Sequence, residues 1–311
     1  MANYTTLDQD TIDRLLAHYN IGDVEKHSSL AGGSANSSIV LTTSSGHYVL
    51  SVCDEKDIDE ISTLTATLDL LSRHSFPTTK LVRTTDGRPF IEYQGKPVYI
   101  KHFIDGEVKE PLRTKMIFQV GSALARLHSI PPTDFLPVSF SYGIECFPEV
   151  YGRNDEYSKW LQQRTDDLQD CCRKELPSGL IHGDLFYDNI LFRGETLTAL
   201  LDFEEVCNYF FVFDLGMCAA GCCCPAGKFS LQSVSGLIDG YQSIRPLTDM
   251  EKELFQCHIE YGAVATSFWR YRQFNIVMPT PEKAEAHLQM KDLAQMVQAI
   301  PKNEFYQAVF G

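Results

Sequence analysis

Two short stretches near the middle of the chain decide its fold: IHGDLFYDN at residues 181–189 and LDFE at residues 201–204. Between them lie the apolar runs 190–192 and 197–201, separated by Arg193-Gly194-Glu195, and this pattern predicts a β-hairpin. A hairpin brings its two ends together, so the polar residues that flank it should converge on one point.

Three of these polar residues carry oxygen atoms that are suited to one task. Asp184 and Asn189 lie before the hairpin, and Asp202 follows it. Carboxylate and amide oxygens are the ligands that Mg²⁺ prefers, with phosphate oxygens completing its octahedron. In phosphoryl transfer, one Asp receives the hydroxyl proton while an Asn and a second Asp hold the metal. The pattern therefore predicts Asp184 as the base, and Asn189 and Asp202 as metal ligands.

The spacing H-x-D-x-x-x-x-N, followed 13 residues later by D-F-E, resembles the catalytic and metal-binding loops of the protein-kinase-like superfamily. Within it the chain is similar to the small-molecule kinases: aminoglycoside phosphotransferases, choline kinases and, most closely, type II homoserine kinases. The segments 120–128, 176–182 and 240–247 resemble the last group. The resemblance implies ATP- and Mg²⁺-dependent transfer of the γ-phosphate to a hydroxyl of a small amine-bearing metabolite, with homoserine as the first expectation.

The resemblance also implies supporting roles for two residues. His182 should pack and hydrogen-bond within the catalytic loop. Asp214, in the sequence Phe213-Asp214-Leu215, matches a structural aspartate of the small-molecule kinases and should accept hydrogen bonds from the backbone of that loop.

The rest of the chain predicts an α+β, bilobal kinase-like fold with a boundary near residues 104–107. Residues 1–104 should form a small antiparallel sheet with one main helix, and residues 105–311 a helical lobe with the catalytic loops. The strands expected in the first lobe are at 39–41, 48–50, 80–83, 89–93 and 97–103, and its helices at 10–19 and 57–73. The helices expected in the second lobe are at 112–128, 155–176, 231–244, 248–271 and 281–300.

A glycine-rich stretch before the first of these strands matches, by its position, the phosphate-covering loop of the superfamily. Glycine and small polar residues let backbone N–H groups approach phosphate oxygens. The expected nucleotide-binding residues are Gly32, Gly33, Ser34 and Asn36 in this loop, with Ile100 and Phe103 in the segment that would contact the adenine edge.

One position departs from the kinase pattern. The strand after the glycine-rich loop normally carries a lysine that contacts the α- and β-phosphates, and this chain has Ser51 there. Lys56 or Lys101 could substitute for it, and Glu60 is either the ion-pair partner of the absent lysine or a solvated helix residue. The departure leaves open an alternative of a different class, a nucleotide-binding pseudokinase that acts as an interaction module.

Four residues are candidates for the acceptor pocket. Glu205 adds a carboxylate next to Asp202 and favours a substrate with an amine. Trp269, Arg270 and Arg272 lie on a predicted helix where small-molecule kinases build this pocket. An arginine could pair with the carboxylate of homoserine, whereas choline would need an aromatic cage. Choline, ethanolamine and aminoglycosides therefore remain alternative acceptors.

Composition limits the partners. The 311 residues include 27 Lys and Arg against 41 Asp and Glu, a net charge of −14, which repels nucleic acid and anionic membranes. The beginning of the chain lacks the features of a signal peptide. A cytoplasmic protein is expected, with its 10 cysteines reduced and mostly buried as small apolar side chains.

Overall fold

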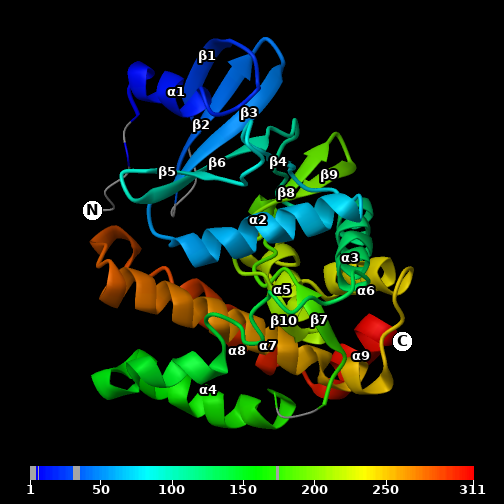
Figure 1. Ribbon diagram of the computed structural model, residues 1–311. Coiled ribbons are helices and arrows are strands. Elements are labelled where there is room, and N and C mark those ends of the chain that lie inside the picture. Colours follow the sequence, from blue (N-terminus) through cyan, green and yellow to red (C-terminus); the bar gives the residue numbers. More distant parts are fainter. Residues whose placement is uncertain (1–4, 6, 31–35, 173–174) are drawn as a thin grey trace. The chain divides into compact units, whose positions relative to one another are not determined.

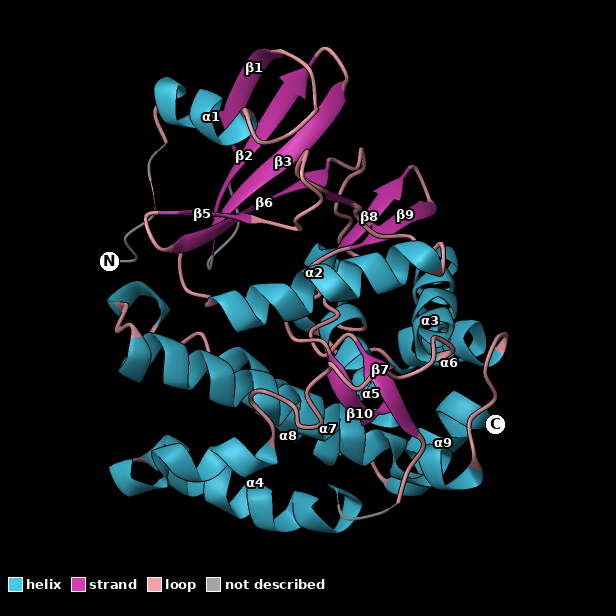
Figure 2. Ribbon diagram, in the orientation of Figure 1, coloured by secondary structure: helices cyan, strands magenta, loops and turns pink. Residues whose placement is uncertain are grey.

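The computed structural model describes residues 5, 7–30, 36–172 and 175–311. The chain forms an α+β fold with two compact units, Met1–Asp105 and Gly106–Gly311, and each is described by itself below. Figure 1 labels their helices and strands, and Figure 2 shows that strands dominate the first unit and helices the second.

The first unit is built on an antiparallel sheet in the order β1-β2-β3-β6-β4, with β5 also paired to β6. A two-residue turn joins β2 to β3, where Thr43 pairs with Gly46. The strands are β1 (Val24–Ser29), β2 (Asn36–Thr43), β3 (Gly46–Cys53), β4 (Leu81–Val82), β5 (Ile91–Tyr93) and β6 (Lys96–His102). The predicted strands are all present, and the sequence did not predict β1, in which five of six residues are exposed.

One apolar cluster of this unit lies on one face of the sheet. Alternate residues of a strand point to the same face, and Leu50 and Val52 of β3 join Val98 and Ile100 of β6 in a single apolar cluster. The helix α1 (Gln9–Leu16) contributes Ile12, which is fully buried, to this cluster.

The second helix of the unit, α2 (Ile58–Arg73), has a capping box at its N-terminus. The Asp57 carboxylate accepts hydrogen bonds from the backbone of Asp59 and Glu60, and Glu60 Oε2 accepts from the backbone N–H of Asp57 at 2.9 Å. Because such reciprocal bonds satisfy the free N–H groups of the first helical turn, the structure gives Glu60 a role in starting the helix.

The second unit is mainly helical. Its helices are α3 (Thr114–His128), α4 (Glu156–Cys172), α5 (Phe211–Cys222), α6 (Leu231–Gln242), α7 (Asp249–Arg272), α8 (Leu288–Gln298) and α9 (Lys302–Phe310). The helix predicted at 281–300 begins later than expected, because residues Pro281–Lys283 form a separate 3₁₀ turn. Among the helices of the described ranges, none has the length and apolar character needed to cross a bilayer.

Helix α5 was missed by the sequence analysis. All of its residues are buried, including Cys218 and Cys222. A helix that is apolar all round lacks the one-sided periodicity that identifies a surface helix. The absence of a side chain at Gly216 permits its close packing on α7, since a Cβ there would lie 2.4 Å from the carbonyl oxygen of His258.

Two small strand pairs complete this unit. β7 (Ser178–Ile181) pairs with β10 (Cys207–Phe210), and β8 (Ile190–Arg193) pairs with β9 (Thr196–Leu200) as the predicted hairpin. The last residue of β7, Ile181, begins the first of the two stretches quoted above, so this strand leads directly into the candidate catalytic loop.

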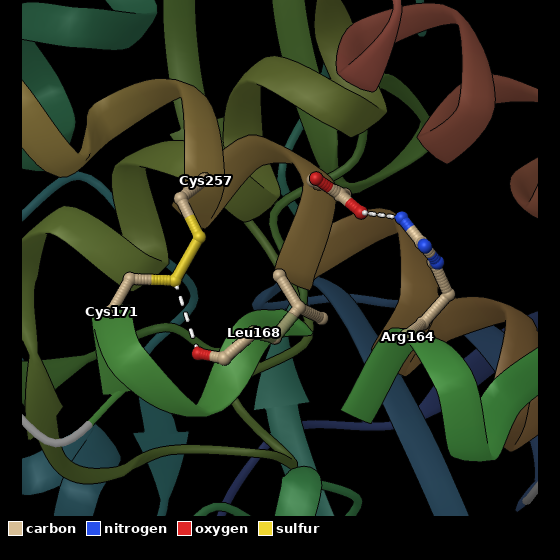
Figure 3. The surroundings of a disulfide bond; sticks show 5 residues. Arg164, Leu168, Cys171 and Cys257 are labelled. Atoms are coloured by element: carbon tan, nitrogen blue, oxygen red, sulfur yellow. Dashed lines mark hydrogen bonds and ion pairs between the residues drawn. A yellow bond between two sulfur atoms is a disulfide. The ribbon is translucent and has the colours of Figure 1, made fainter. Parts of the chain in front are cut away.

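A disulfide joins α4 to α7 (Figure 3). It links Cys171 with Cys257, 86 residues apart. Arg164 of α4 also forms an ion pair with Glu260 of α7 at 3.4 Å. The expectation that every thiol is reduced is therefore wrong for this pair, because the packing of α4 on α7 brings two distant cysteines together. Within the described part of the chain the buried cysteines outside this disulfide are Cys53, Cys207, Cys218, Cys222 and Cys223.

Candidate active site

The loop that carries Asp184 is held by a buried carboxylate. Asp214, on α5, is fully buried and accepts hydrogen bonds from the backbone N–H groups of His182 and Gly183, each at 2.8 Å. Gly183 has a φ of +84°, and a Cβ at this position would lie 2.6 Å from the carbonyl oxygen of Glu205. The loop therefore needs both the Asp214 carboxylate as its hydrogen-bond acceptor and the absence of a side chain at residue 183.

Asp214 is itself held by a chain of side chains that the sequence analysis missed. The Nε2 atom of His128 lies 2.9 Å from its carboxylate, and the Tyr241 hydroxyl lies 2.7 Å from His128 Nδ1. Burial lowers the pKa of His128, so the ring is favoured in its neutral form, with Nε2–H donating to Asp214. The sequence feature that could have pointed to His128 is its position as the last residue of a predicted amphipathic helix.

His182 ties the two catalytic stretches together. Its Nε2–H donates to the carbonyl oxygen of Leu201 at 2.8 Å, and its Nδ1 accepts from the backbone N–H of Asp184 at 3.3 Å. The ring also packs on Phe203, with 4.6 Å between the centroids. The side chain therefore bridges the loop before the hairpin and the segment after it.

The hairpin brings the three oxygen-bearing residues into one region. The backbone N–H of Leu201 donates to the carbonyl oxygen of Asn189 at 2.8 Å, which places Asp202 one residue beyond that pairing. The Asn189 amide nitrogen donates to the backbone carbonyl of Asp184 at 2.9 Å. Because this bond uses the amide nitrogen, it does not occupy the amide oxygen Oδ1 of Asn189.

The electrostatics of Asp184 reflect a mostly buried carboxyl group among other acids. Burial, followed by repulsion from Asp202 and Glu205, raises the pKa of Asp184 to about 7. The hydroxyl of Tyr142 donates to Asp184 Oδ1 at 3.1 Å and acts in the opposite direction. A raised pKa near neutrality is a common property of groups that exchange a proton during catalysis.

The donor set fits a hard divalent cation. Asp202 is exposed and adopts the left-handed conformation, with a φ of 63° that aspartate tolerates. With the amide oxygen of Asn189, it offers two oxygen ligands on adjacent arms of the hairpin. In the described part of the chain, no three or more His, Cys, Asp or Glu side chains form a metal-binding group. Two protein ligands are nevertheless usual for Mg²⁺ that also binds substrate phosphates.

A cavity of about 160 Å³ lies in the second unit beside these residues. It brings Glu205, Trp269 and Arg272 together, although they are distant in sequence. The Arg272 guanidinium pairs with Glu149 at 2.6 Å, and the Ser141 hydroxyl donates to Glu205. The residues that line the cavity and bear on its chemistry are Ser141, Tyr142, Glu149, Glu205, Trp269 and Arg272. Because Arg272 already has a carboxylate partner, the free charge of the cavity is the acidic Glu205.

Arg270 lines a different cavity, of about 170 Å³, together with Asp188. One guanidinium nitrogen donates to the Ala286 carbonyl at 3.2 Å and to Gln289 Oε1 at 2.8 Å. Burial lowers the pKa of Arg270, and the charges of Asp184 and Asp188 oppose this effect. The arginine therefore lies within electrostatic range of the candidate base.

The expected nucleotide-binding residues lie in the first unit. Gly32, Gly33 and Ser34 fall outside the described residues, and Asn36 is the first residue of β2. Ile100 is fully buried in the apolar cluster and lies between β3 and β4. Its side chain therefore belongs to the core. Phe103, directly after β6, is 39% exposed.

Ser51 is buried, and its hydroxyl lies 2.9 Å from that of Ser38 on β2. On the other side of β3, Ser51 pairs with Tyr99 of β6, and Val49 pairs with Lys101. Alternate residues share a face, so the register places Lys101 on the same face of the sheet as Ser51. Of the two lysines considered as substitutes, Lys101 is the one that the sheet register connects to Ser51.

An ion pair in this unit was not predicted from the sequence. Lys96 forms an ion pair with Asp54 at 2.6 Å, and the Asp54 side chain is only 7% exposed. The same carboxylate accepts from the backbone N–H of Ser37 at 3.0 Å. Asp54 thus fixes the residue that follows Asn36 at the beginning of β2.

The match to a family of known proteins defines the class of this chain as an enzyme that transfers a phosphoryl group. The model of the phosphotransferase enzyme family matches residues 26–247, and the chain belongs to this family. It is therefore a small-molecule kinase that uses an alcohol group as acceptor.

Two relatives are homoserine kinases of bacteria. The chain is 30% identical to the protein of Chelativorans sp. (strain BNC1) over 264 residues, with 82% of each chain covered. It is 31% identical to that of Mesorhizobium japonicum over 263 residues, covering 81% of this chain and 82% of the relative.

Solved structures with the same fold are more distant in sequence. An amicoumacin kinase solved with AMP-PNP and Ca²⁺ aligns with a TM-score of 0.76 at 13% identity, covering 96% of this chain and 97% of that one. A microcompartment-associated aminopropanol kinase aligns with a TM-score of 0.75 at 18% identity, covering 97% and 100%. These likenesses establish the kinase-like α+β fold.

Proposed function

We propose that this protein transfers the γ-phosphate of ATP, in the presence of Mg²⁺, to the hydroxyl of a small amino acid of the homoserine type. The observation that carries the proposal is the mostly buried Asp184 carboxylate beside Asn189 and Asp202. The backbone of their loop donates a hydrogen bond to the buried Asp214. The homoserine kinases related to this chain support the choice of acceptor.

Asp184 would orient the acceptor hydroxyl and take its proton late in the transfer. Asn189 and Asp202 would hold Mg²⁺ through their side-chain oxygens. When bound, the metal neutralises charge on the phosphate oxygens. The bond from Asn189 to the backbone of Asp184 would keep the base and the ligand at a fixed separation.

The two charged sites near Asp184 suit an acceptor with two charged groups. Glu205 would bind the ammonium group from the acidic cavity, and Arg270 would bind the carboxylate. Arg270 is the better choice for this role than Arg272, because the guanidinium of Arg272 is already paired with Glu149.

A second candidate acceptor is an amino alcohol without a carboxylate, such as ethanolamine or choline. The aromatic rings of Trp269 and Tyr142, with centroids 6.5 Å apart, border the cavity that contains Glu205. Aromatic faces next to a carboxylate favour organic ammonium groups. The fold shared with an aminopropanol kinase and an ethanolamine kinase is compatible with this choice.

The first experiment measures ADP release with ATP and Mg²⁺ across homoserine, choline, ethanolamine, aminosugars and aminoglycosides. Asp184→Asn should lower kcat with the preferred acceptor by about 10²- to 10⁴-fold, while ATP binding measured by calorimetry persists. Asp239→Asn, an exposed carboxylate on α6, is the matched control and should behave as wild type. Equal turnover by wild type and Asp184→Asn would refute the assignment of the base.

A second experiment separates the two acceptor classes. Arg270→Gln should raise KM for homoserine by about 10- to 100-fold and leave KM for ethanolamine nearly unchanged. Glu205→Gln should raise KM for both acceptors, since both carry an amine. A wild-type protein that binds ATP but phosphorylates none of these acceptors would favour the pseudokinase alternative motivated by Ser51.

A further inference from the structure

We propose that Tyr142 is a positioning residue for phosphotransfer: its phenol O–H holds the Asp184 carboxylate in one orientation, with the second carboxylate oxygen directed toward the acceptor. This inference rests on the proposed function, in which Asp184 is the base. Neither the catalytic stretches nor the resemblance to small-molecule kinases pointed to this tyrosine.

The contact is direct and involves a residue from outside the catalytic loop. The Tyr142 hydroxyl donates to Asp184 Oδ1 at 3.1 Å across 42 residues of sequence. Within the described residues, it is the only hydrogen bond that the Asp184 side chain receives. The loop backbone is held by Asp214 and His182, so the bond from Tyr142 acts on the carboxylate of Asp184 and not on the loop backbone.

The tyrosine is well placed to act as a fixed donor. Its side chain is almost fully buried, and its ring packs on Phe140 with 4.2 Å between the centroids. A buried aromatic ring has few alternative rotamers, so packing determines where its hydroxyl oxygen lies. A carboxylate without this bond could rotate about its Cβ–Cγ bond and exchange its two oxygens.

The orientation matters because the base must lie within hydrogen-bond reach of the hydroxyl proton. Small errors in the placement of reacting groups lower rates strongly. Asp202 and Glu205 repel the Asp184 carboxylate. The bond from the tyrosine supplies an attractive contact that holds Oδ1 in one place.

Tyr142 also borders the cavity of about 160 Å³ that contains Glu205 and Trp269. One residue therefore touches both the base and the space proposed for the amine of the acceptor. The structure thus assigns Tyr142 a link between acceptor binding and the orientation of the base.

The test uses Tyr142→Phe, which keeps the ring and removes only the O–H. Tyr157→Phe is the matched control, because Tyr157 is also buried in the second unit and donates one hydrogen bond, to Ser267 Oγ at 3.0 Å. Both variants are compared with wild type in steady-state kinetics, ATP-binding calorimetry and urea unfolding.

Tyr142→Phe should lower kcat by about 10- to 100-fold without changing ATP affinity, and should lose no more unfolding free energy than the control. Tyr157→Phe should keep the wild-type kcat. In an Asp184→Asn background, Tyr142→Phe should cause no further loss of kcat, because the two residues act as a unit.

The outcomes separate this inference from the proposed function. Wild type that transfers phosphate to no acceptor in the panel refutes the function itself. Active wild type with an unchanged kcat in Tyr142→Phe refutes only the role of Tyr142. An equal additional loss of kcat in the Asp184→Asn background would also overturn it, because the effect would then act through another group. The double variant remains informative if Tyr142→Phe is less stable, because that substitution lowers stability equally in wild type and in the Asp184→Asn variant.

Discussion

Asp214 is the residue whose substitution should affect the folding and the activity of the helical unit together. Its buried carboxylate accepts from two backbone N–H groups of the catalytic loop and from His128. A buried carboxylate is stable only when such donors surround it. The same residue therefore determines where the loop lies and whether Asp184 is correctly placed.

We expect Asp214→Asn to lower the free energy of unfolding by about 3 kcal/mol, because it replaces an acceptor of charge-assisted bonds and leaves buried donors unpaired. It should also reduce kcat. Urea unfolding and the ADP-release assay measure the two effects. Asp166→Asn, at an exposed position of α4, is the control. A stable Asp214→Asn protein with the wild-type kcat would contradict this role.

His258 gives the chain a defined dependence of stability on pH. It is fully buried on α7, and in the described part of the chain neither ring nitrogen has a hydrogen-bond partner. Burial lowers the pKa of His258 to about 3, below the value of the unfolded chain. The unfolded chain therefore binds the proton first, and stability is lost as the pH falls below about 6.5.

We expect the unfolding free energy of the His258→Leu variant to fall less steeply with decreasing pH than that of wild type. The difference in slope should be about 1.4 kcal/mol per pH unit between pH 6 and 4.5. Urea titrations at several pH values measure it, and the exposed-site variant His74→Gln should retain the wild-type slope. Parallel curves for wild type and His258→Leu would show that the histidine titrates normally.

At the scale of secondary-structure elements, glycines set how closely α3 and α6 approach. A Cβ at Gly121 of α3 would lie 2.0 Å from the carbonyl oxygen of Leu237, and one at Gly240 of α6 would lie 1.9 Å from that of Phe118. These neighbours are backbone atoms, which cannot move as a flexible side chain can. The two helices also carry His128 and Tyr241, so their close approach builds the support of Asp214.

Gly121→Ala and Gly240→Ala should each lower the unfolding free energy by about 2–4 kcal/mol through overpacking. The higher helix propensity of alanine by itself would raise the unfolding free energy by about 1 kcal/mol. Overpacking and helix propensity therefore act in opposite directions here. Urea unfolding decides between the two signs. Gly152→Ala, where a Cβ meets nothing within 4 Å, should have little effect. Stabilisation by either helix substitution would contradict the observed packing.

The disulfide between α4 and α7 acts at the same scale. Cys171 and Cys257 enclose a long segment of chain, and a cross-link over that separation restricts the unfolded state. A variant with Cys171→Ser and Cys257→Ser should lose about 2–4 kcal/mol of stability, and dithiothreitol should cause the same loss in wild type only. Cys172→Ser is the control, since the neighbouring Cys172 is free. A thiol titration that finds ten free cysteines in oxidising buffer would contradict the bond.

On the scale of the whole molecule, the sequence determined those features that depend on short spacing. The hairpin of β8 and β9, the helices with one apolar face and the order of Asp184, Asn189 and Asp202 all follow from residues within about one element of each other. The family model, which covers residues 26–247, likewise confirms the kinase class predicted from the catalytic stretches.

Only the tertiary structure decided which distant residues surround those stretches. Tyr142 reaches Asp184 across 42 residues, and His128 reaches Asp214 across 86. The helix α5, which is buried on all sides, and the cysteine pair of α4 and α7 also gave no periodic signal. The physical reason is that periodicity reports which face of a single element is buried, whereas the partner on that face is chosen by the packing of whole helices against one another.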